Sequence, residues 1–325
     1  MMQEKSMNRP NLSMEWLRSN TTTIGPILFV IAVVAIFQVI NPSFLSYQGI
    51  ITLIYAMSYF LIAACGLTFV IMTGSFDFSV PNMLKLSALI CVLYIEKIGL
   101  LVIPVALLVC LGFGFINGLL LAKFKVPSFL ATLGISIVVD GIAWFLSKGH
   151  LLIMQDVKFR SLSTTFIAGF PSILYWGIGI WIICTFLALA TAFGRRTYAV
   201  GGNLEGAGLS DINVARHRIY IFMLSGFLSG LAGVLYMYQM GGGSANIGAD
   251  MAIPLFASVV AGGTALTGGV GGPHRTILGV IIITWIQAGM SMLAIGKDIQ
   301  MITFGLIAIG MSIATVDRKR IKIVK

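Results

Sequence analysis

Charged side chains are scarce in this sequence. Asp, Glu, Lys and Arg make up 10% of its 325 residues, and 58% of the residues are hydrophobic. A soluble domain carries about 25% charged residues. Uncharged apolar runs recur along nearly the whole chain, and a helix needs about 17–25 apolar residues to cross the hydrocarbon core of a bilayer. The composition excludes an ordinary soluble domain and predicts an all-α polytopic membrane protein, because a β-barrel would show short alternating segments instead.

Cysteine and histidine are also few, and their positions exclude several kinds of site. Four cysteines lie far apart inside apolar runs without CxxC spacing, which predicts small buried residues: Cys65, Cys91, Cys110 and Cys184. Three histidines fall at predicted loops near the membrane surfaces, with no carboxylate or cysteine at ligand spacing: His150, His217 and His274. We therefore predict no metal site.

The sequence also lacks the motifs of an enzyme. No Ser-His-Asp or Cys-His arrangement is visible, and no GxxxxGK[ST] phosphate loop is present. The stretch GGVGGPHRT (268–276) has glycines but lacks the Lys-Ser/Thr pair that would contact phosphate and Mg²⁺. The chain itself is therefore predicted to have neither catalytic activity nor a cofactor.

Apolar runs predict about ten transmembrane helices. The runs lie at about 24–40, 50–72, 82–95, 98–122, 127–147, 172–193, 219–238, 252–267, 276–295 and 299–316. The third and eighth are short for a full span, and short or interrupted segments in transporters mark broken helices. The eighth runs into AGGTALTGGVGGP (261–273), which is too rich in glycine for a plain helix.

Lysine and arginine predict the orientation. With the N-terminus inside, the inner side receives Lys5, Arg9, Arg18, Lys123, Lys125, Arg195, Arg196, Arg216, Arg218, Arg275 and the five basic residues of 318–325. The outer side receives Lys97, Lys148, Lys158, Arg160 and Lys297, and Lys85 lies within a segment and is left uncounted. Fifteen basic residues against five place both termini in the cytoplasm.

This topology divides the chain into three parts. Residues 1–23 form a polar cytoplasmic segment, too long for the n-region of a signal peptide, so the first apolar run is expected to be a retained span. A transmembrane domain follows at 24–316, and a basic cytoplasmic tail at 317–325. The longest inner loop is 194–218, and the longest outer loop is about 148–171.

The stretch GSFDFSVP (74–81) places Asp77 between apolar runs, at a break near the inner end of the second span or in a re-entrant turn. Asp77 or Ser79 can cap the next helix, with Pro81 in its first turn. A carboxylate within the membrane is equally a candidate for a functional site, because non-helical backbone at that depth is tolerated only inside protein or along a cavity. Both interpretations stay open.

Other polar residues within the membrane are further candidates for the pathway of a solute. Asp140 is a second intramembrane carboxylate, and it either caps a break beside Gly141 or belongs to a functional site. VIMTGSFDFSVP and SVVAGGTALTGG each end an apolar run in a break, which indicates a weak internal repeat. The pathway candidates are Ser75, Asp77, Ser79, Asp140, Thr264 and Thr267.

Two further patterns concern helix packing and the inner loop. Gly112, Gly114 and Gly118 in LGFGFINGLL have the small-xxx-small spacing that suits close helix packing. In the loop 194–218, LEGAGLSDINV (204–214) is predicted either to form a short helix along the membrane surface or to be a solvated connector.

Three separated stretches carry a resemblance to a known family. They are GLTFVIMTGSFDFSVP (66–81), YAVGGNLEGAGLSDINVARHRIYIFMLSGFLSGLAGVLY (198–236) and ASVVAGGTALTGGVGG (257–272). In this order they resemble the permease subunits of bacterial ABC importers for ribose, galactose, related sugars and autoinducer-2. The resemblance extends over about residues 44–316. Ser75, Phe76, Phe78 and Pro81 depart from the family pattern, as do Gly206 and Asp211 in the loop, so the substrate stays open.

The resemblance implies a permease in the bacterial inner membrane that moves a small polar solute, most simply a monosaccharide. A separate cytoplasmic ATPase would use ATP and grip a coupling helix in the loop 194–218. An extracytoplasmic binding protein would deliver the solute, and a second permease subunit, identical or not, would complete the pathway. By resemblance, the residues that dock the ATPase are Gly202, Asn203, Glu205, Ala207, Leu209 and Ile212. Leu209 and Ile212, three residues apart, are expected to share one apolar helix face.

Two alternatives remain at this point. A secondary transporter driven by an ion gradient would place titratable groups near the midplane, where Asp77 and Asp140 are the candidates. The same kind of ABC permease is also compatible with a nucleoside or autoinducer-2 as its solute.

Overall fold

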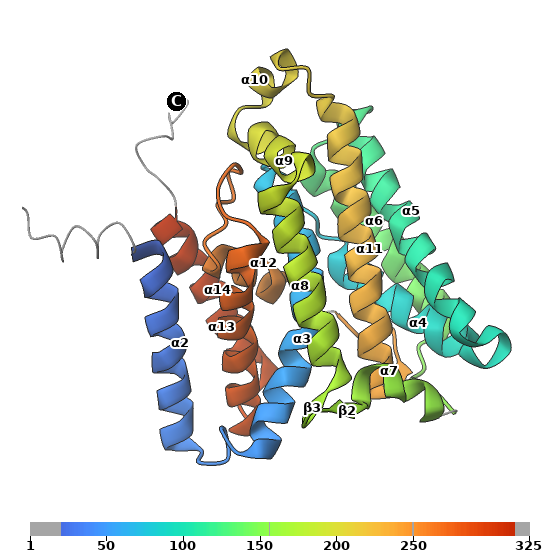
Figure 1. Cartoon of the computed structure of the whole chain (residues 1–325). Coiled ribbons are helices and arrows are strands. Elements are labelled where there is room, and N and C mark those ends of the chain that lie inside the picture. Colours follow the sequence, from blue (N-terminus) through green and yellow to red (C-terminus); the bar gives the residue numbers. More distant parts are fainter. Residues whose placement is uncertain (1–20, 156, 249, 316–325) are drawn as a thin grey trace, which may run out of the picture.

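The computed structural model describes residues 21–155, 157–248 and 250–315, and these residues fold almost entirely into helices (Figure 1). The longer helices are α2 (Thr21–Ile40), α3 (Tyr47–Met72), α4 (Val80–Ile98), α5 (Val102–Ala122), α6 (Ser128–Ser147), α8 (Ser172–Ala190), α9 (Ala192–Gly202), α11 (Val214–Met240), α12 (Ala252–Ala261), α13 (Pro273–Met292) and α14 (Lys297–Thr315). The shorter elements are η1 (Gly99–Leu101), β1 (Leu152–Ile153), η2 (Val157–Arg160), α7 (Ser161–Thr164), β2 (Phe166–Ile167), β3 (Phe170–Pro171), α10 (Leu204–Leu209) and β4 (Gly242–Gly243).

The predicted all-α polytopic architecture is confirmed. Each of the ten apolar runs overlaps a helix, and six helical stretches are long and apolar enough to cross a membrane, with α4 and α5 counted together as one stretch. The third run is longer than expected, since α4 begins two residues earlier and continues to Ile98. The eighth is short, as predicted, because α12 has only ten residues before the glycine-rich break. The number of helices that cross the bilayer stays a prediction.

The boundaries of the three predicted parts stay predictions. The N-terminal part was expected to end at residue 23, whereas α2 already begins at Thr21. Residues 1–20 and the tail 317–325 lie outside the described residues. The long outer loop is not a plain connector, because it contains β1, η2, α7, β2 and β3.

Helix α11 is the centre of the fold and packs against α3, α4 and α5. Glycines allow this close approach: a methyl group at Gly233 would overlap the Leu84 carbonyl of α4, and one at Gly114 of α5 would overlap the Phe222 carbonyl of α11. The predicted packing role is confirmed for Gly114 and Gly118, whereas Gly112 faces open space. The buried core around α3 and α11 also contains Cys65 and Cys184, and all four cysteines are buried and free, as predicted.

The two ends of the molecule differ. Figure 1 shows that α2 begins and α14 ends toward the end where α9 and α10 lie, whereas the α2–α3 turn, α7 and the β2–β3 hairpin lie at the opposite end. At that opposite end the long loop is tied to α11, because Ser163 Oγ donates to the Leu235 carbonyl at 2.8 Å and the Arg160 guanidinium donates to the Gln239 carbonyl at 3.0 Å. We refer below to the end with α9 and α10 as the inner end and to the other as the outer end, following the predicted orientation.

Two non-helical breaks interrupt the helical bundle. The first break (73–79) separates α3 from α4, and the second break (262–272) separates α12 from α13. They are far apart in the sequence but touch at the inner end, where the Gly269 N–H donates to the Met72 carbonyl at 2.9 Å. A methyl group at Gly74 would lie 3.2 Å from the Thr267 carbonyl oxygen. The two stretches that the sequence pairs as a weak repeat are therefore neighbours in space.

Candidate functional site

A polar row on α6 holds the first break in place. The row consists of residues spaced four apart, which places them on one helix face: Ser128, Thr132, Ser136 and Asp140. The Phe76 N–H donates to Ser128 Oγ at 3.0 Å, and the Phe78 N–H donates to Thr132 Oγ1 at 3.1 Å. Ser136 Oγ donates to the Phe78 carbonyl at 3.1 Å. Side chains of α6 thus satisfy the backbone groups that a helix would have satisfied internally.

Asp77 is fully buried at the centre of this break. One carboxylate oxygen accepts hydrogen bonds from the Ser79 N–H at 3.0 Å and from Ser79 Oγ, and the other accepts one from Ser225 Oγ of α11 at 2.8 Å. Asn117 of α5 adds a bond from its amide to Ser79 Oγ at 2.9 Å. Asp77 therefore connects the break to α11 directly and to α5 through Ser79.

The structure changes the capping interpretation of this stretch. Pro81 lies in the first turn of α4, as predicted, but the Ser79 side chain makes no capping hydrogen bond. Asp77 bonds the N–H of Ser79, immediately before the helix, and it also bonds α11. A pure cap does not account for both contacts, because the second one crosses to another helix. Whether the charge also acts in transport stays a prediction.

Asp140 does not cap a break, because α6 continues without interruption from Ser128 to Ser147. Its carboxylate forms an ion pair with Lys85 of α4. Lys85 Nζ also donates to the Ala245 carbonyl at 3.0 Å, which ties the segment after α11 to this pair. Sequence reasoning set Lys85 aside. The four-residue spacing from Ser128 to Asp140 is the signal that places Asp140 on the polar face of α6. This face contacts the first break and α4.

Beside this ion pair lies a cavity of ≈ 350 Å³, which we call the upper cavity. It lies between α4, α6 and the segment from Ala245 to Ala252. Its polar lining includes Asn82, Lys85, Ser136, Asp140 and Asn246, and its aromatic lining includes Phe78 and Trp144. A volume of this size is at the lower end of the range for small-molecule sites.

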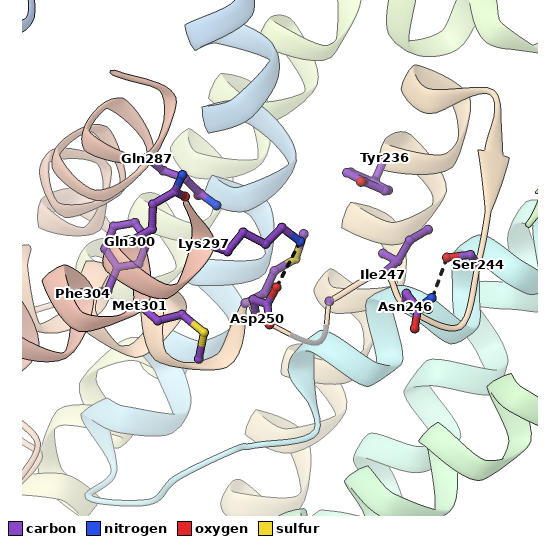
Figure 2. A pocket seen from close by; sticks show the side chains of 12 residues that line it. Tyr236, Ser244, Asn246, Ile247, Asp250, Gln287, Lys297, Gln300, Met301 and Phe304 are labelled. Atoms are coloured by element: carbon purple, nitrogen blue, oxygen red, sulfur yellow. Dashed lines mark hydrogen bonds and ion pairs between the residues drawn. The ribbon is translucent and has the colours of Figure 1, made fainter. Parts of the chain in front are cut away.

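A second cavity of ≈ 250 Å³, the lower cavity, lies on the other side of the same segment. Figure 2 shows Gln287, Gln300, Met301 and Phe304 on one side of it and Tyr236 and Ile247 on the other. The Lys297 ammonium contacts the Asp250 carboxylate at 3.2 Å between these two sides (Figure 2). Asn246 and Gly248 line both cavities, so the segment from Ser244 to Gly248 separates them.

The remaining pathway candidates lie closer to the inner end. Ser75 is buried and accepts a hydrogen bond from Thr73 Oγ1 at 3.2 Å. Thr264 Oγ1 accepts one from the Gly272 N–H at 3.1 Å and so closes the second break, and Thr267 is exposed beside Gly74. Of the six predicted pathway residues, Asp140 lines one of these two cavities. Roles in transport for all six stay predictions.

The inner loop folds into two short helices, which favours a folded surface element over a solvated connector. Helix α10 is capped by Asn203, whose Oδ1 accepts from the Gly206 N–H at 2.9 Å. Gly202, Asn203 and Glu205 are exposed, and Leu209 is 91% exposed. The Leu209 side chain is therefore accessible to a partner protein.

One residue of the predicted docking set is buried, and the helix face expected for two others is wrong. The docking roles themselves stay predictions. Ala207 is only 4% exposed, so it packs inward and leaves the exposed face to its neighbours. Ile212 does not share a helix face with Leu209, because α10 ends at Leu209 and Asp211 takes a left-handed conformation with φ of 59°. A left-handed residue reverses the chain and ends the helix.

Helix α9 connects this surface element to both breaks. A methyl group at Gly201 would overlap the Met72 carbonyl and lie 2.6 Å from the Gly269 nitrogen, so only glycine fits there. The Tyr198 hydroxyl donates to the Gly271 carbonyl at 2.7 Å. Burial raises the pKa of Tyr198, and the nearby Arg275 partly opposes this, so the phenol stays protonated as a donor at neutral pH.

Two of the three histidines are not in loops. His217 lies in the first turn of α11, buried, with Nε2 at 3.0 Å from Thr197 Oγ1 of α9. His274 lies in the first turn of α13. The sequence signal was weak, because both residues sit at the boundary between a polar stretch and an apolar run. His217 thereby adds a contact between α9 and α11.

Comparisons with known proteins agree with this geometry. The family model described as the permease component of the branched-chain amino acid transport system matches residues 49–314. The ribose import permease protein RbsC of Haemophilus influenzae is 34% identical over 289 residues, 85% of this chain and 88% of that protein. The Bacillus subtilis ribose import permease protein RbsC is 32% identical, over 91% and 93% of the two chains.

A relative named for a different sugar also matches. The L-arabinose transport system permease protein AraH of Escherichia coli is 29% identical over 294 residues, 90% of this chain and 88% of that protein. No solved structure gives a significant match. The family description names amino acids and the relatives name sugars, and the relatives cover the chain more fully. The chain therefore belongs to this permease family, as a multi-pass inner-membrane permease of the sugar ABC importer kind.

Proposed function

We propose that the chain is the membrane-spanning subunit of an ABC importer that moves a neutral monosaccharide, a pentose or hexose, into the cytoplasm. A separate ATPase drives it, an extracytoplasmic binding protein delivers the sugar, and a second permease subunit completes the pathway. The similar ribose and L-arabinose permeases support a sugar as the solute. In this proposal about ten helices cross the membrane, both termini are cytoplasmic, and ATP binds the partner and not this chain.

The observation that carries the proposal is the way in which α9 and α10 pack against the two breaks. The exposed residues Gly202, Asn203, Glu205 and Leu209 form a small surface at the inner end, beyond the helical bundle. Behind this surface, Gly201 packs directly on Met72 at the end of α3 and on Gly269 in the second break. A partner that moves α10 therefore pushes on both breaks at once.

From the first break, movement has a short route into the membrane. The break is hydrogen-bonded to α6 through Phe76 and Phe78, and to α11 through Asp77 and Ser225. The Thr197–His217 contact adds a second link from α9 to α11. We infer that ATP binding and hydrolysis in the partner shift α9 and α10, and that these contacts convert the shift into opening toward one side or the other. Coupling of this kind is reciprocal, so the loaded binding protein must stimulate hydrolysis.

The two carboxylates fit an ATP-driven transporter better than an ion-coupled one. Asp140 is paired with Lys85, and Asp77 accepts three hydrogen bonds. A coupling carboxylate has to exchange its ion in each cycle, and these contacts hold both groups in a fixed state. The rival is tested directly: sugar uptake by the purified chain alone, driven by an ion gradient, would overturn the proposal.

The coupling surface is tested with a matched pair of variants. Leu209→Asp places a charge on the exposed apolar residue of α10, and Leu151→Asp does the same at an exposed leucine in the outer loop. The chain is reconstituted in nanodiscs with its ATPase, and ATP hydrolysis is measured with and without the sugar-loaded binding protein. Leu209→Asp is expected to reduce the rate about tenfold or more with and without the binding protein, as loss of a central contact does, and Leu151→Asp to change the rate without the binding protein less than about twofold. Equal rates in the two variants would refute the docking assignment.

A further inference from the structure

The upper cavity opens to water or to protein, and not to lipid. The Asp140 side chain is 40% exposed although it lies in a membrane helix, and Trp144, one turn later on the same helix, is 44% exposed. A carboxylate facing hydrocarbon is costly, and intramembrane charges face the interior or a water-filled cavity. The face of α6 that carries Asp140 and Trp144 therefore faces water or protein.

The charges of this cavity cancel. Among its twelve lining residues, Lys85 and Asp140 are the charged ones, and they form an ion pair with Lys85 only 2% exposed. The lower cavity repeats the pattern, since its charged lining residues, Asp250 and Lys297, are also paired. A charged solute entering either cavity would lose hydration without gaining an unpaired counter-charge. This arrangement favours an uncharged solute.

Hydrogen-bonding capacity remains free beside the ion pair. Within the described residues, the ion pair uses one oxygen of Asp140, and the Asn82 amide nitrogen donates to Ser136. The second Asp140 oxygen and Asn82 Oδ1 are left as acceptors at the cavity, and Asn246 adds an amide side chain. Lys85 donates to Asp140 and Ala245, which leaves one of its three N–H groups. Hydrogen-bond donors and acceptors around one cavity can bind the hydroxyl groups that surround a sugar ring.

Trp144 supplies the complementary apolar surface. An indole ring offers a flat apolar face for the C–H groups of a sugar ring, while neighbouring polar groups bind its hydroxyls. Asp140 and Trp144 are four residues apart on α6, so both lie on the face that lines the cavity. We propose that the upper cavity is a sugar-binding subsite within the permease, and that the Lys85–Asp140 pair makes it selective for uncharged sugars. The part of this inference that concerns import rests on the proposed function. The binding of a sugar in the cavity does not depend on the ATPase or on the direction of transport.

The test measures binding to the full chain in nanodiscs, without ATPase or binding protein. Ala252→Cys places one thiol in the lining of the cavity, and the four native cysteines are buried. The rate of labelling by a hydrophilic maleimide is measured with increasing D-ribose, D-galactose, D-galacturonate or D-galactosamine. The neutral sugars are expected to slow labelling, and the two charged analogues of galactose to protect at least about tenfold more weakly. Protection by galacturonate or galactosamine equal to that by galactose, or no protection by either neutral sugar, would overturn the proposal.

Matched variants locate the effect. Trp144→Ala is expected to weaken protection by the neutral sugars about tenfold, and Trp176→Ala, at a tryptophan of α8 with 43% exposure, to leave it unchanged. Because Trp144 is half-exposed, its replacement leaves the fold intact, which gel filtration checks. Asp140→Asn leaves Lys85 without its counter-charge, and protection is expected to shift from galactose toward galacturonate. Equal behaviour of the two tryptophan variants contradicts the subsite.

The two proposals fail separately. If the Leu209→Asp variant leaves ATP hydrolysis unchanged while neutral sugars still protect the Ala252→Cys variant in a way that depends on Trp144, the coupling proposal fails and the subsite stands. If coupling holds and sugars give no protection, the subsite fails alone.

Discussion

The two breaks of this permease meet the same physical requirement by different means. Each leaves backbone N–H and C=O groups outside a helix, in a chain that spans a membrane, and such groups have to be satisfied by protein. The first break relies on side chains from other helices: Ser128 and Thr132 of α6 and Ser225 of α11. The second relies mostly on tight turns of its own chain, with positive φ at Gly263, Gly268, Gly269, Gly271 and Gly272. The Ala265 N–H bonds the Val270 carbonyl and the Gly272 N–H bonds Thr264 Oγ1, and α3 and α9 add the Met72 carbonyl and the Tyr198 hydroxyl as partners.

This difference indicates a division of roles. A break held by side chains from α6 and α11 moves with those helices, so it is suited to carry a movement across the membrane. A break built from glycine turns is a compact surface on which Gly201 of α9 is seated. The first break therefore links the helices to one another, and the second links them to the inner surface. Substitutions at three positions test this contrast.

The largest expected effect is at Asp77. Asp77→Ala removes the acceptor of three buried hydrogen bonds and leaves Ser225 and Ser79 without it, so the free energy of unfolding should fall by about 3–5 kcal/mol. Thermal unfolding at one fixed heating rate measures the loss, with Asp298→Ala at an exposed position as the control, where the change should stay below about 1 kcal/mol. Asp77→Asn keeps the geometry of the turn. Normal folding with lost transport in that variant would show that the charge itself is needed.

A somewhat smaller effect is expected at Gly269. A methyl group there would meet the Gly202 Cα at 2.8 Å, and φ of 75° is unfavourable for alanine. Gly269→Ala should lower stability by about 2–3 kcal/mol and should reduce stimulation of the ATPase, because the seat of α9 is displaced. Gly112→Ala, in an open position of α5, should be neutral or stabilising by up to about 1 kcal/mol. Equal stability and equal ATPase stimulation in the two glycine variants would show that α9 does not depend on packing against the second break.

The smallest effect is expected on the polar row of α6. Thr132→Val leaves the Phe78 N–H without its acceptor and should cost about 1–3 kcal/mol, whereas Thr132→Ser retains the hydroxyl and should cost less than about 1 kcal/mol. Thr303→Val, at a partly exposed threonine of α14, is the control in the same unfolding assay. A loss as large for serine as for valine would assign the effect to packing and not to the hydrogen bond.

Sequence reasoning located the elements better than their contacts. It placed ten apolar runs that all overlap helices, and it singled out GSFDFSVP and the glycine-rich stretch as breaks. It left Asp140 open between a cap and a functional site, because a carboxylate beside a glycine resembles a cap until its partner is known, and the partner Lys85 is 55 residues away. It also extended the coupling helix to Ile212, because the left-handed conformation of Asp211 leaves little signal in an apolar pattern.

The class of protein and its family can be read from the chain alone, because apolar length, charge asymmetry and ordered motifs are properties of the sequence. Which polar residues meet was settled by packing: Asp77 with Ser225, Lys85 with Asp140, and Gly201 with Met72 and Gly269. Each of these contacts joins residues that are far apart in the chain, and a buried polar group at membrane depth is stable only with such a partner. The break at GSFDFSVP can be recognised in the sequence, but only the tertiary structure shows that α6 and α11 hold it.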